Sequence, residues 1–239
     1  MDRKALWSRY QDRYIASAEL GFALDTSRMD ASDEFFASMQ KPFEKAFAAM
    51  EELEKGAIAN PDENRMVGHY WLRNPNIAPE KEAEETKETL RKLKNLVEKI
   101  HSGYHRGPNG ELFTNVVIVG IGGSALGPQL ARAALTNKHD LMSVHFLDNT
   151  DPDGMDLVFE QIETKVKKTL VVVVSKSGGT KETRNGMLEI KNFFEKNDLT
   201  FENQAVAVTG EGSALDQIAQ KDKWIARLPM FDYIGGRTS

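Results

Sequence analysis

Two kinds of hydrophobic pattern divide the chain near residue 110. Before that point, apolar side chains recur at helical spacing and runs of β-branched residues are absent. One expected helix begins after the capping sequence Ser32-Asp33-Glu34 and runs to about Lys55. A second expected helix follows Pro79, carries the apolar stripe Leu90, Leu93, Val97 and Ile100, and ends near Gly103. The pattern therefore predicts a helical N-terminal region over residues 1–110.

From Asn115 onward, short apolar and β-branched runs alternate with segments of helical spacing. The runs predict strands at residues 116–121, 143–147, 169–174, 204–208 and 224–228. The segments between them predict helices at residues 127–136, 154–164, 180–196 and 212–221. Strands that are apolar on both faces are typical of a parallel sheet covered by helices. Residues 111–239 are therefore expected to form a doubly wound, five-stranded, three-layer α/β domain with right-handed crossovers.

Composition narrows the classes of protein that fit. The 239 residues are 40% hydrophobic and 28% charged, which is the profile of a globular protein. The absence of cysteine excludes a disulfide scaffold, a cysteine nucleophile and a thiolate metal site, and it favours a cytoplasmic location. The charged N-terminus argues against a secretory signal, and no apolar run is long enough for a membrane span. A net charge of −5 without a basic stripe argues against nucleic acid as a partner.

Glycines cluster directly after three of the expected strands. The clusters lie at Gly120–Gly127, Gly178-Gly179 and Gly235-Gly236. Ligands of open α/β sheets bind beyond the carboxyl ends of the strands, where successive connections diverge to opposite faces. With the common strand order 2-1-3-4-5, the first and third strands are neighbours at that point. The loops that follow these two strands are therefore expected to line one crevice.

The loop after the third strand has the composition of a phosphate cradle. It reads Ser175-Lys176-Ser177-Gly178-Gly179-Thr180, and Thr183 adds another hydroxyl one turn later. Its glycines allow close backbone approach, and the next helix offers unpaired N–H groups at its positive end. Lys176 adds a charge, although its side chain could point elsewhere. A Walker loop is excluded by the residue order, whereas a Ser/Thr helix cap with turn glycines remains an alternative.

The loop after the first strand also allows a nicotinamide-dependent enzyme. Gly120-x-Gly122-x-x-Ala125 fits the relaxed dinucleotide fingerprint, and Asp148 stands where a ribose-binding carboxylate would. Against this reading, a dinucleotide site does not call for a second, Ser/Thr-rich phosphate loop. Asp148 could equally belong to the turn that runs to Asp153. The residues favour a sugar phosphate over a dinucleotide without excluding either.

Four motifs together resemble the glucose-6-phosphate isomerase (phosphoglucose isomerase) family. They are Glu63-Asn64-Arg65 with His69 and Leu72-Arg73, then Gly120–Pro128, then Ser175–Thr183, then Gly235-Gly236-Arg237. They occur in the family's order and span most of the chain. The resemblance implies a sugar-isomerase (SIS) domain in which a five-stranded parallel sheet lies between helices. Gly178-Gly179 is similar to the bacterial type, whereas Phe231-Asp232-Tyr233 departs from the tryptophan-rich segment usual there.

The resemblance also implies roles for particular residues. Gly123 and Ser124 match a substrate-contacting pair, and Arg237 matches the arginine that faces the reacting carbons. The 6-phosphate ligands would be the hydroxyls of Ser175, Ser177, Thr180 and Thr183 with the backbone of Lys176, Gly178 and Gly179. The implied reaction is the reversible isomerisation of glucose 6-phosphate to fructose 6-phosphate through an enediol, in glycolysis and gluconeogenesis. It implies no metal and no cofactor, and a homodimer for the complete protein.

The family is longer than this chain, and its general base, ring-opening histidine and catalytic lysine match positions beyond Ser239. The chain is therefore expected to be an N-terminal, phosphate-binding part that lacks the second SIS domain and is inactive alone. A non-catalytic SIS module that binds sugar phosphates is the second alternative to an isomerase. Among other candidates, His101 and His105 have helical metal spacing that Gly103 interrupts, and His145 is expected to be a satisfied core or sheet residue.

Overall fold

The computed structural model describes residues 2–236. Contacts within the chain divide it into two compact units, Met1–Glu51 and Glu52–Ser239. This division does not follow the change of sequence pattern near residue 110, because the long helix before that residue packs on the sheet that follows it.

The first unit contains helices and one β-hairpin. Its elements are α1 (Arg3–Arg13), β1 (Tyr14–Ser17), β2 (Phe22–Asp25), α2 (Asp33–Ser38) and α3 (Gln40–Glu54), whose last turn reaches the second unit. The Ser32 hydroxyl accepts a hydrogen bond from Phe35 N–H, which confirms the expected cap. The all-helical expectation is wrong over residues 14–25, where β1 and β2 pair antiparallel. The helix expected from residue 32 to 55 is also divided, at Met39.

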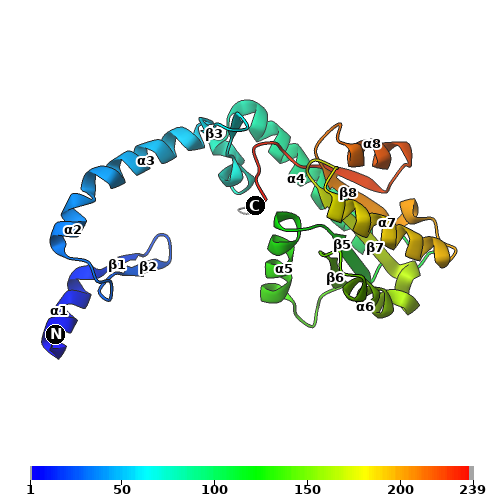
Figure 1. Ribbon diagram of the computed structural model, residues 1–239, viewed down its shortest axis with the longest axis horizontal. Helices are drawn as coiled ribbons and strands as arrows, with labels where there is room; N and C mark the ends of the chain where they lie inside the picture. The colour runs from blue at the N-terminus through cyan, green and yellow to red at the C-terminus, as the bar shows by residue number, and fades with distance from the viewer. Residues whose placement is uncertain (1, 237–239) are drawn as a thin grey trace. The chain divides into compact units, whose positions relative to one another are not determined.

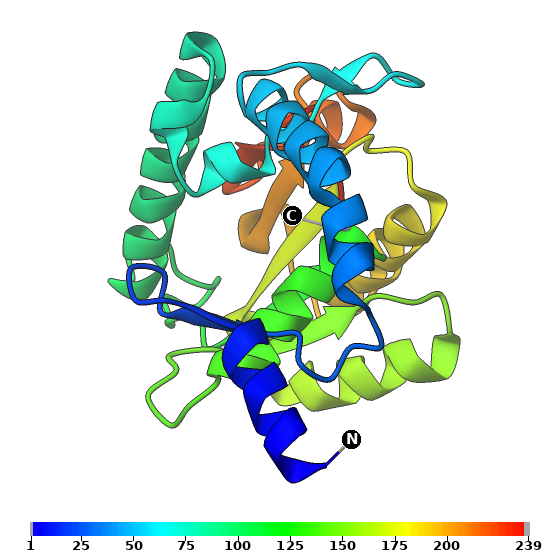
Figure 2. The same ribbon diagram turned by 90° about the vertical axis from the view of Figure 1, so that its left-hand side faces the viewer.

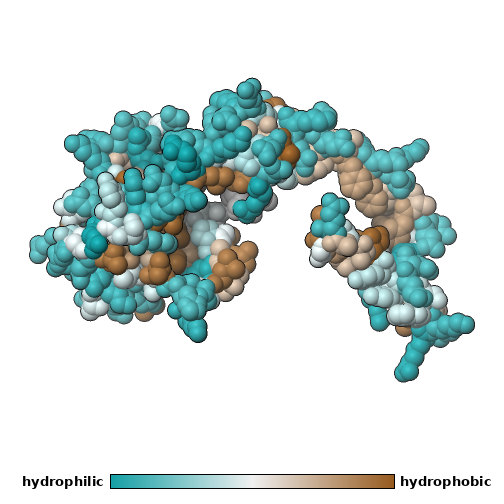
Figure 3. All heavy atoms as spheres, turned by 180° about the vertical axis from the view of Figure 1, so that it is seen from behind, coloured by the Kyte–Doolittle hydropathy of each residue, from teal (hydrophilic) through white to brown (hydrophobic). Residues whose placement is uncertain are grey.

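No apolar side chain among residues 2–51 of the first unit is buried. Ser27 is the one buried residue among positions 2–51. Large side chains such as Trp7, Ile15 and Phe47 are more than half exposed, and Figure 3 shows apolar atoms along this unit in brown. The residues of this unit therefore do not form a hydrophobic core of their own.

The second unit begins with short elements and a long helix. These are β3 (Ile58–Asn60), β4 (Arg65–Met66), the 3₁₀ turns η1 (His69–Leu72) and η2 (Pro75–Ile77), and α4 (Glu80–His101). The β3–β4 hairpin is a second departure from the all-helical expectation. Helix α4 is confirmed, but Leu90, Leu93 and Val97 of the expected stripe are exposed. Leu96 and Ile100 are the apolar side chains of α4 that pack on the sheet.

Five parallel strands form the sheet of the second unit. They are β5 (Asn115–Val119), β6 (Ser143–Leu147), β7 (Thr169–Ser175), β8 (Ala205–Thr209) and β9 (Ala226–Pro229). Their order is β6-β5-β7-β8-β9, which confirms the expected 2-1-3-4-5 arrangement of an SIS-type sheet. Helices α5 (Gly123–Leu135), α6 (Pro152–Ile162), α7 (Lys181–Lys196) and α8 (Ala214–Lys221) connect them, with 3₁₀ turns η3 (Glu163–Lys168) and η4 (Phe201–Gln204) (Figure 1).

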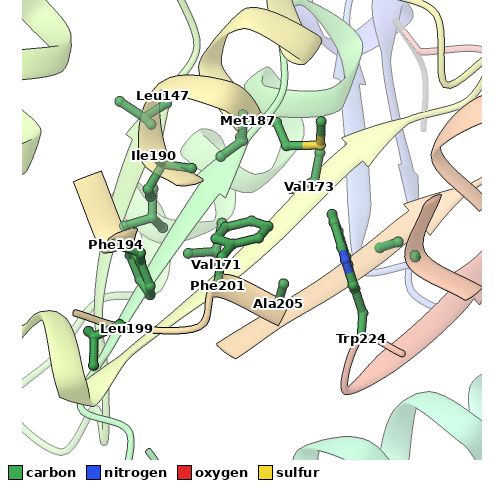
Figure 4. Packing of buried hydrophobic residues seen from close by; sticks show 14 of the residues in the cluster. Leu147, Val171, Val173, Met187, Ile190, Phe194, Leu199, Phe201, Ala205 and Trp224 are labelled. Carbon is green, nitrogen blue, oxygen red and sulfur yellow. The ribbon is translucent and has the colours of Figure 1, made fainter. Parts of the chain in front are cut away.

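Alternating strand residues build a core on each face of the sheet. Val117, Val119, Val171 and Val173 point to the face that α6, α7 and α8 cover, where Phe194 is fully buried. Figure 4 shows aromatic rings and aliphatic side chains interleaved in this cluster. On the other face, Leu170 and Val206 pack with side chains of α4. Figure 2 shows α4 and α7 on opposite sides of the strands, so the sheet is the middle of three layers.

An ion pair holds the start of α8, which supports the loop after β7. Asp216 accepts hydrogen bonds from Gly212 N–H at 3.0 Å and from Arg227 of β9 at 2.6 Å. Burial alone would raise the pKa of this carboxyl. The two hydrogen bonds outweigh burial, and they hold the pKa below the ordinary value of 3.8. The ionised form of Asp216 therefore stabilises the folded state.

We expect Asp216→Asn to lower the free energy of unfolding by about 1–2 kcal/mol at neutral pH. Because the folded-state pKa is lowered, this contribution is present above the unfolded pKa and is lost as the pH falls. Urea denaturation of both proteins at pH 7 and at about pH 2.5 measures the difference. A loss of equal size at both pH values would contradict the assignment of this effect to the charge.

Candidate functional site

The segment after β5 runs directly into helix α5. The expected start of this helix at residue 127 is wrong, because α5 begins at Gly123, so Gly123 and Ser124 lie in its first turn. No side chain caps this turn. A Cβ on Gly120 would lie 3.2 Å from the carbonyl oxygen of Val174, near the end of β7. The two glycine-rich segments after β5 and β7 therefore begin side by side, on neighbouring parallel strands.

The hydroxyls of the loop after β7 gather at the start of α7. Ser175 Oγ lies 3.3 Å and Ser177 Oγ 3.5 Å from Thr180 Oγ1, and Gly179 N–H donates to Ser177 Oγ at 3.2 Å. Thr183 is buried one turn further on. Thr180 stands at the N-cap position but makes no capping hydrogen bond with its side chain. This detail argues against a simple Ser/Thr cap, because the first-turn N–H groups are left for another acceptor.

The two glycines of this loop have different surroundings. Gly178 has a φ of +66°, and a Cβ there would lie 2.5 Å from the backbone nitrogen of Leu215 in α8. Only glycine combines this left-handed backbone with so close a contact. A Cβ on Gly179 would instead meet nothing nearer than Ser177 Oγ at 4.0 Å. Gly178 thus seats the loop on α8, whereas the backbone of Gly179 lies beside the hydroxyl cluster.

The side chain of Lys176 leaves the hydroxyl cluster. Its ammonium group donates to the carbonyl oxygens of Asp232 and Ile234, both at 2.9 Å. Desolvation and the nearby charge of Arg65 lower the pKa of Lys176. The lysine charge that the sequence places in the loop therefore ties this loop to the C-terminal segment.

That C-terminal segment reaches the start of α5. A Cβ on Gly123 would lie 2.2 Å from the Cα of Gly236, so two backbones touch there (Figure 1). The structure thus brings the first and third glycine clusters together, and Lys176 links the second cluster to the same segment. Arg237, the residue expected to face the reacting carbons, lies outside the described residues.

Residues before the sheet hold the C-terminal segment from the other side. Gly68 N–H donates to the Tyr233 carbonyl at 2.9 Å, and the buried Trp71 packs edge-on against the Tyr233 ring. His69 Nε2 lies 2.9 Å from Gly235 N. The resemblance gives His69 no catalytic role, but His69 lies in the Glu63–Arg73 motif of the helical part that carries this resemblance. Its place in that motif is the signal in the sequence that connects His69 with the site.

Other candidate residues have ordinary structural partners. Gln129 of α5 donates to the Asp148 carboxylate. Asp151 caps α6 by accepting from Gly154 N–H. His145 of β6 lies within hydrogen-bond distance of Gln161 and Asn115, which confirms a structural environment. Among residues 2–236, no group of three or more His, Asp or Glu side chains is placed to hold a metal ion. No helix of this part is both long and apolar enough to cross a membrane.

A cavity of about 500 Å³ lies between α4 and residues 229–233, away from the hydroxyl cluster. Acidic side chains predominate in its lining: Glu82, Glu85, Glu88, Glu211 and Asp232, against Lys81 and Lys92. A phosphate dianion would be repelled by such a lining. The chemistry expected of the site therefore belongs to the glycine-rich segments and not to this cavity.

Comparison with known proteins identifies the family. A sequence model of phosphoglucose isomerase matches residues 25–239. Curated glucose-6-phosphate isomerases of Geotalea daltonii and Trichormus variabilis are 54% and 51% identical over the whole chain. The chain spans 45% and 46% of their lengths.

Among solved structures, a glucose-6-phosphate isomerase from Chlamydia trachomatis superposes with a TM-score of 0.83 at 27% identity. That match covers 97% of this chain and 44% of the other. The solved structure thus has the same fold over nearly all of this chain. The family model also extends through all three glycine clusters. The chain belongs to the phosphoglucose isomerase family.

Proposed function

We propose that this chain is the phosphate-binding part of an enzyme that interconverts glucose 6-phosphate and fructose 6-phosphate in glycolysis and gluconeogenesis. The observation that carries the proposal is the meeting of three glycine-rich segments at the carboxyl edge of the sheet. Family membership and the names of the relatives support the same reaction. Because the chain spans less than half of those relatives, the activity is proposed for the complete protein.

In this proposal the hydroxyl cluster holds the 6-phosphate. Ser175, Ser177, Thr180 and Thr183 supply hydroxyl donors, and the backbone of Lys176, Gly178 and Gly179 lines the same cradle. The N-terminus of α7 adds its positive dipole to the same place. Anchoring the unreactive end orients the sugar, so that binding energy at the phosphate lowers the barrier at the carbons.

The reacting carbons would lie towards Gly123, Ser124 and Arg237. A base moves a proton between C2 and C1, and negative charge develops on the enediolate oxygens. Acid–base transfer of this kind contributes typically 10²–10⁴-fold to the rate. The guanidinium of Arg237 would stabilise the enediolate without reorganising, as a fixed charge does in a preformed site. The general base is expected from the remainder of the complete protein.

Thermal unfolding with added ligands separates the alternatives. We expect fructose 6-phosphate to raise the melting temperature of the chain and NAD to leave it unchanged, because ligands stabilise the state that binds them. Protection by NAD alone would instead favour a dinucleotide enzyme.

Turnover by the complete protein separates an isomerase from a non-catalytic sugar-phosphate module. We expect conversion of glucose 6-phosphate to fructose 6-phosphate without added metal or cofactor. If the sugar phosphate raises the melting temperature but is not converted, the isomerase hypothesis is wrong and the non-catalytic binding module is supported. A homodimeric state and a cytoplasmic location complete the proposal, and gel filtration of the complete protein with light scattering tests the former.

A further inference from the structure

Gly235 is held by one side chain from the distant N-terminal part of the same unit. His69 Nε2 lies 2.9 Å from the nitrogen of Gly235 and 3.0 Å from its carbonyl oxygen. Among residues 2–236, no other group hydrogen-bonds to either atom. The two residues are 166 positions apart in the chain, so this contact exists only in the folded protein.

His69 itself stands on a rigid support. It opens the turn η1, and Trp71 in the same turn is fully buried with its indole N–H donating to the Glu54 carbonyl at 2.9 Å. Gly68, the preceding residue, is hydrogen-bonded to Tyr233. A Cβ on Gly68 would lie 2.1 Å from the Trp71 ring, so this packing leaves little space. The packing of Trp71 and Gly68 therefore holds the turn that places the His69 imidazole next to Gly235.

The other contacts of the C-terminal segment are made by the residues on either side of Gly235. Lys176 binds the carbonyls of Asp232 and Ile234, and Gly236 rests on Gly123. Between these anchors, Gly235 has no side chain of its own to pack. A neutral imidazole nitrogen can either accept from the Gly235 N–H or donate to the Gly235 carbonyl, depending on the tautomer. Each arrangement satisfies one backbone group and limits rotation of the glycine.

We propose that His69 is a positioning residue, which holds Gly235-Gly236 against Gly123 at the place where the proposed function puts the reacting carbons. This inference rests on the proposed function, in which Arg237 stabilises the enediolate. His69 contacts the backbone of Gly235, which lies apart from the proposed phosphate ligands in sequence, so its contribution is expected in the chemical step. The hydroxyl cluster makes its own contacts without His69.

Steady-state kinetics of the complete protein tests this role. We expect His69→Leu to lower kcat about tenfold, because the hydrogen bond that orients the segment is lost, while KM changes less than twofold. His69→Gln keeps a donor and an acceptor at the end of the side chain, so we expect kcat within threefold of the original. Unchanged kcat in His69→Leu, or an equal fall in both variants, would overturn the proposal.

Amide hydrogen exchange gives a readout that does not depend on activity. We expect residues 230–236 to exchange at least fivefold faster in His69→Leu than in the original protein, and at the original rate in His69→Gln. This result would stand even if the complete protein did not isomerise sugar phosphates, a failure that concerns the proposed function alone. Equal exchange in all three proteins would refute the positioning role. His69→Phe, with a ring but no nitrogen, replaces His69→Leu if the latter does not fold.

Discussion

Replacing Gly123 with alanine is expected to lower kcat of the complete protein by about 100-fold or more. The new methyl group would lie 2.2 Å from the Cα and 2.3 Å from the carbonyl carbon of Gly236. Both neighbours are backbone atoms, which cannot rotate away as a side chain can. The C-terminal segment must therefore move by about 1 Å or more, and a shift of that size at a reacting group can cost 10²-fold.

The effect should fall on turnover and not on phosphate binding. The hydroxyl cluster at the start of α7 is held by contacts within its own loop, so fructose 6-phosphate should still raise the melting temperature of Gly123→Ala. Arg237→Ala, which removes the guanidinium, is the reference variant. Loss of one donor that stabilises the transition state typically lowers kcat by about 10²–10³-fold. We expect the two variants to have similar kcat values and nearly unchanged KM.

Gly235→Ala is the matched control for this prediction. A Cβ at Gly235 would lie 3.7 Å from His69 Nε2, which is an ordinary contact. We expect its kcat to fall less than threefold. If Gly123→Ala retained the original turnover, the contact between the two glycine clusters would have no part in the chemistry.

Gly178→Ala is expected to abolish protection by sugar phosphates and to lower the free energy of unfolding by about 2–3 kcal/mol. Its φ of +66° costs an alanine about 1 kcal/mol or more. The methyl group would also lie 2.5 Å from the nitrogen of Leu215 and 2.9 Å from Ser213 Oγ. The loop must lift from α8, and the hydroxyls of Ser177 and Thr180 would move with it.

Gly179→Ala separates binding from folding at the neighbouring position. Its methyl group would meet only Ser177 Oγ, at 4.0 Å. We therefore expect an unchanged free energy of unfolding and a severalfold weaker affinity for fructose 6-phosphate. Urea denaturation and calorimetric titration of both variants measure the two quantities. If Gly178→Ala and the original protein bound fructose 6-phosphate with equal affinity, the loop after β7 would not be part of the binding site.

The acidic cavity beside α4 shows why hollow shape alone does not locate this site. It is lined by the residues around Tyr233 but carries mostly carboxylates. The loop after β7 instead gathers the hydroxyls of Ser175, Ser177 and Thr180 at the start of α7, where a helix N-terminus favours an anion. We therefore base the proposed site on the chemistry of these donors and not on the volume of the cavity.

The sequence by itself determined the sheet and the position of its loops. Apolar runs such as Leu170–Val174 are specified locally, because a strand buried on both faces is mostly apolar. Once the strand order followed the common arrangement, the segments after β5 and β7 had to be neighbours. Periodicity failed over Tyr14–Asp25 and Ile58–Met66, where short hairpins carry too few residues to establish a period.

Only the tertiary structure decided how the third glycine cluster joins the site. The contacts of Gly236 with Gly123, of Lys176 with Ile234 and of His69 with Gly235 connect residues far apart in sequence. Two of them involve backbone atoms of glycines, which have no side chain whose type could reveal a partner. The direction of a lysine side chain likewise depends on which carbonyls fold within its reach. Such contacts follow from the packing of the whole unit, because local sequence sets neither their distance nor their orientation.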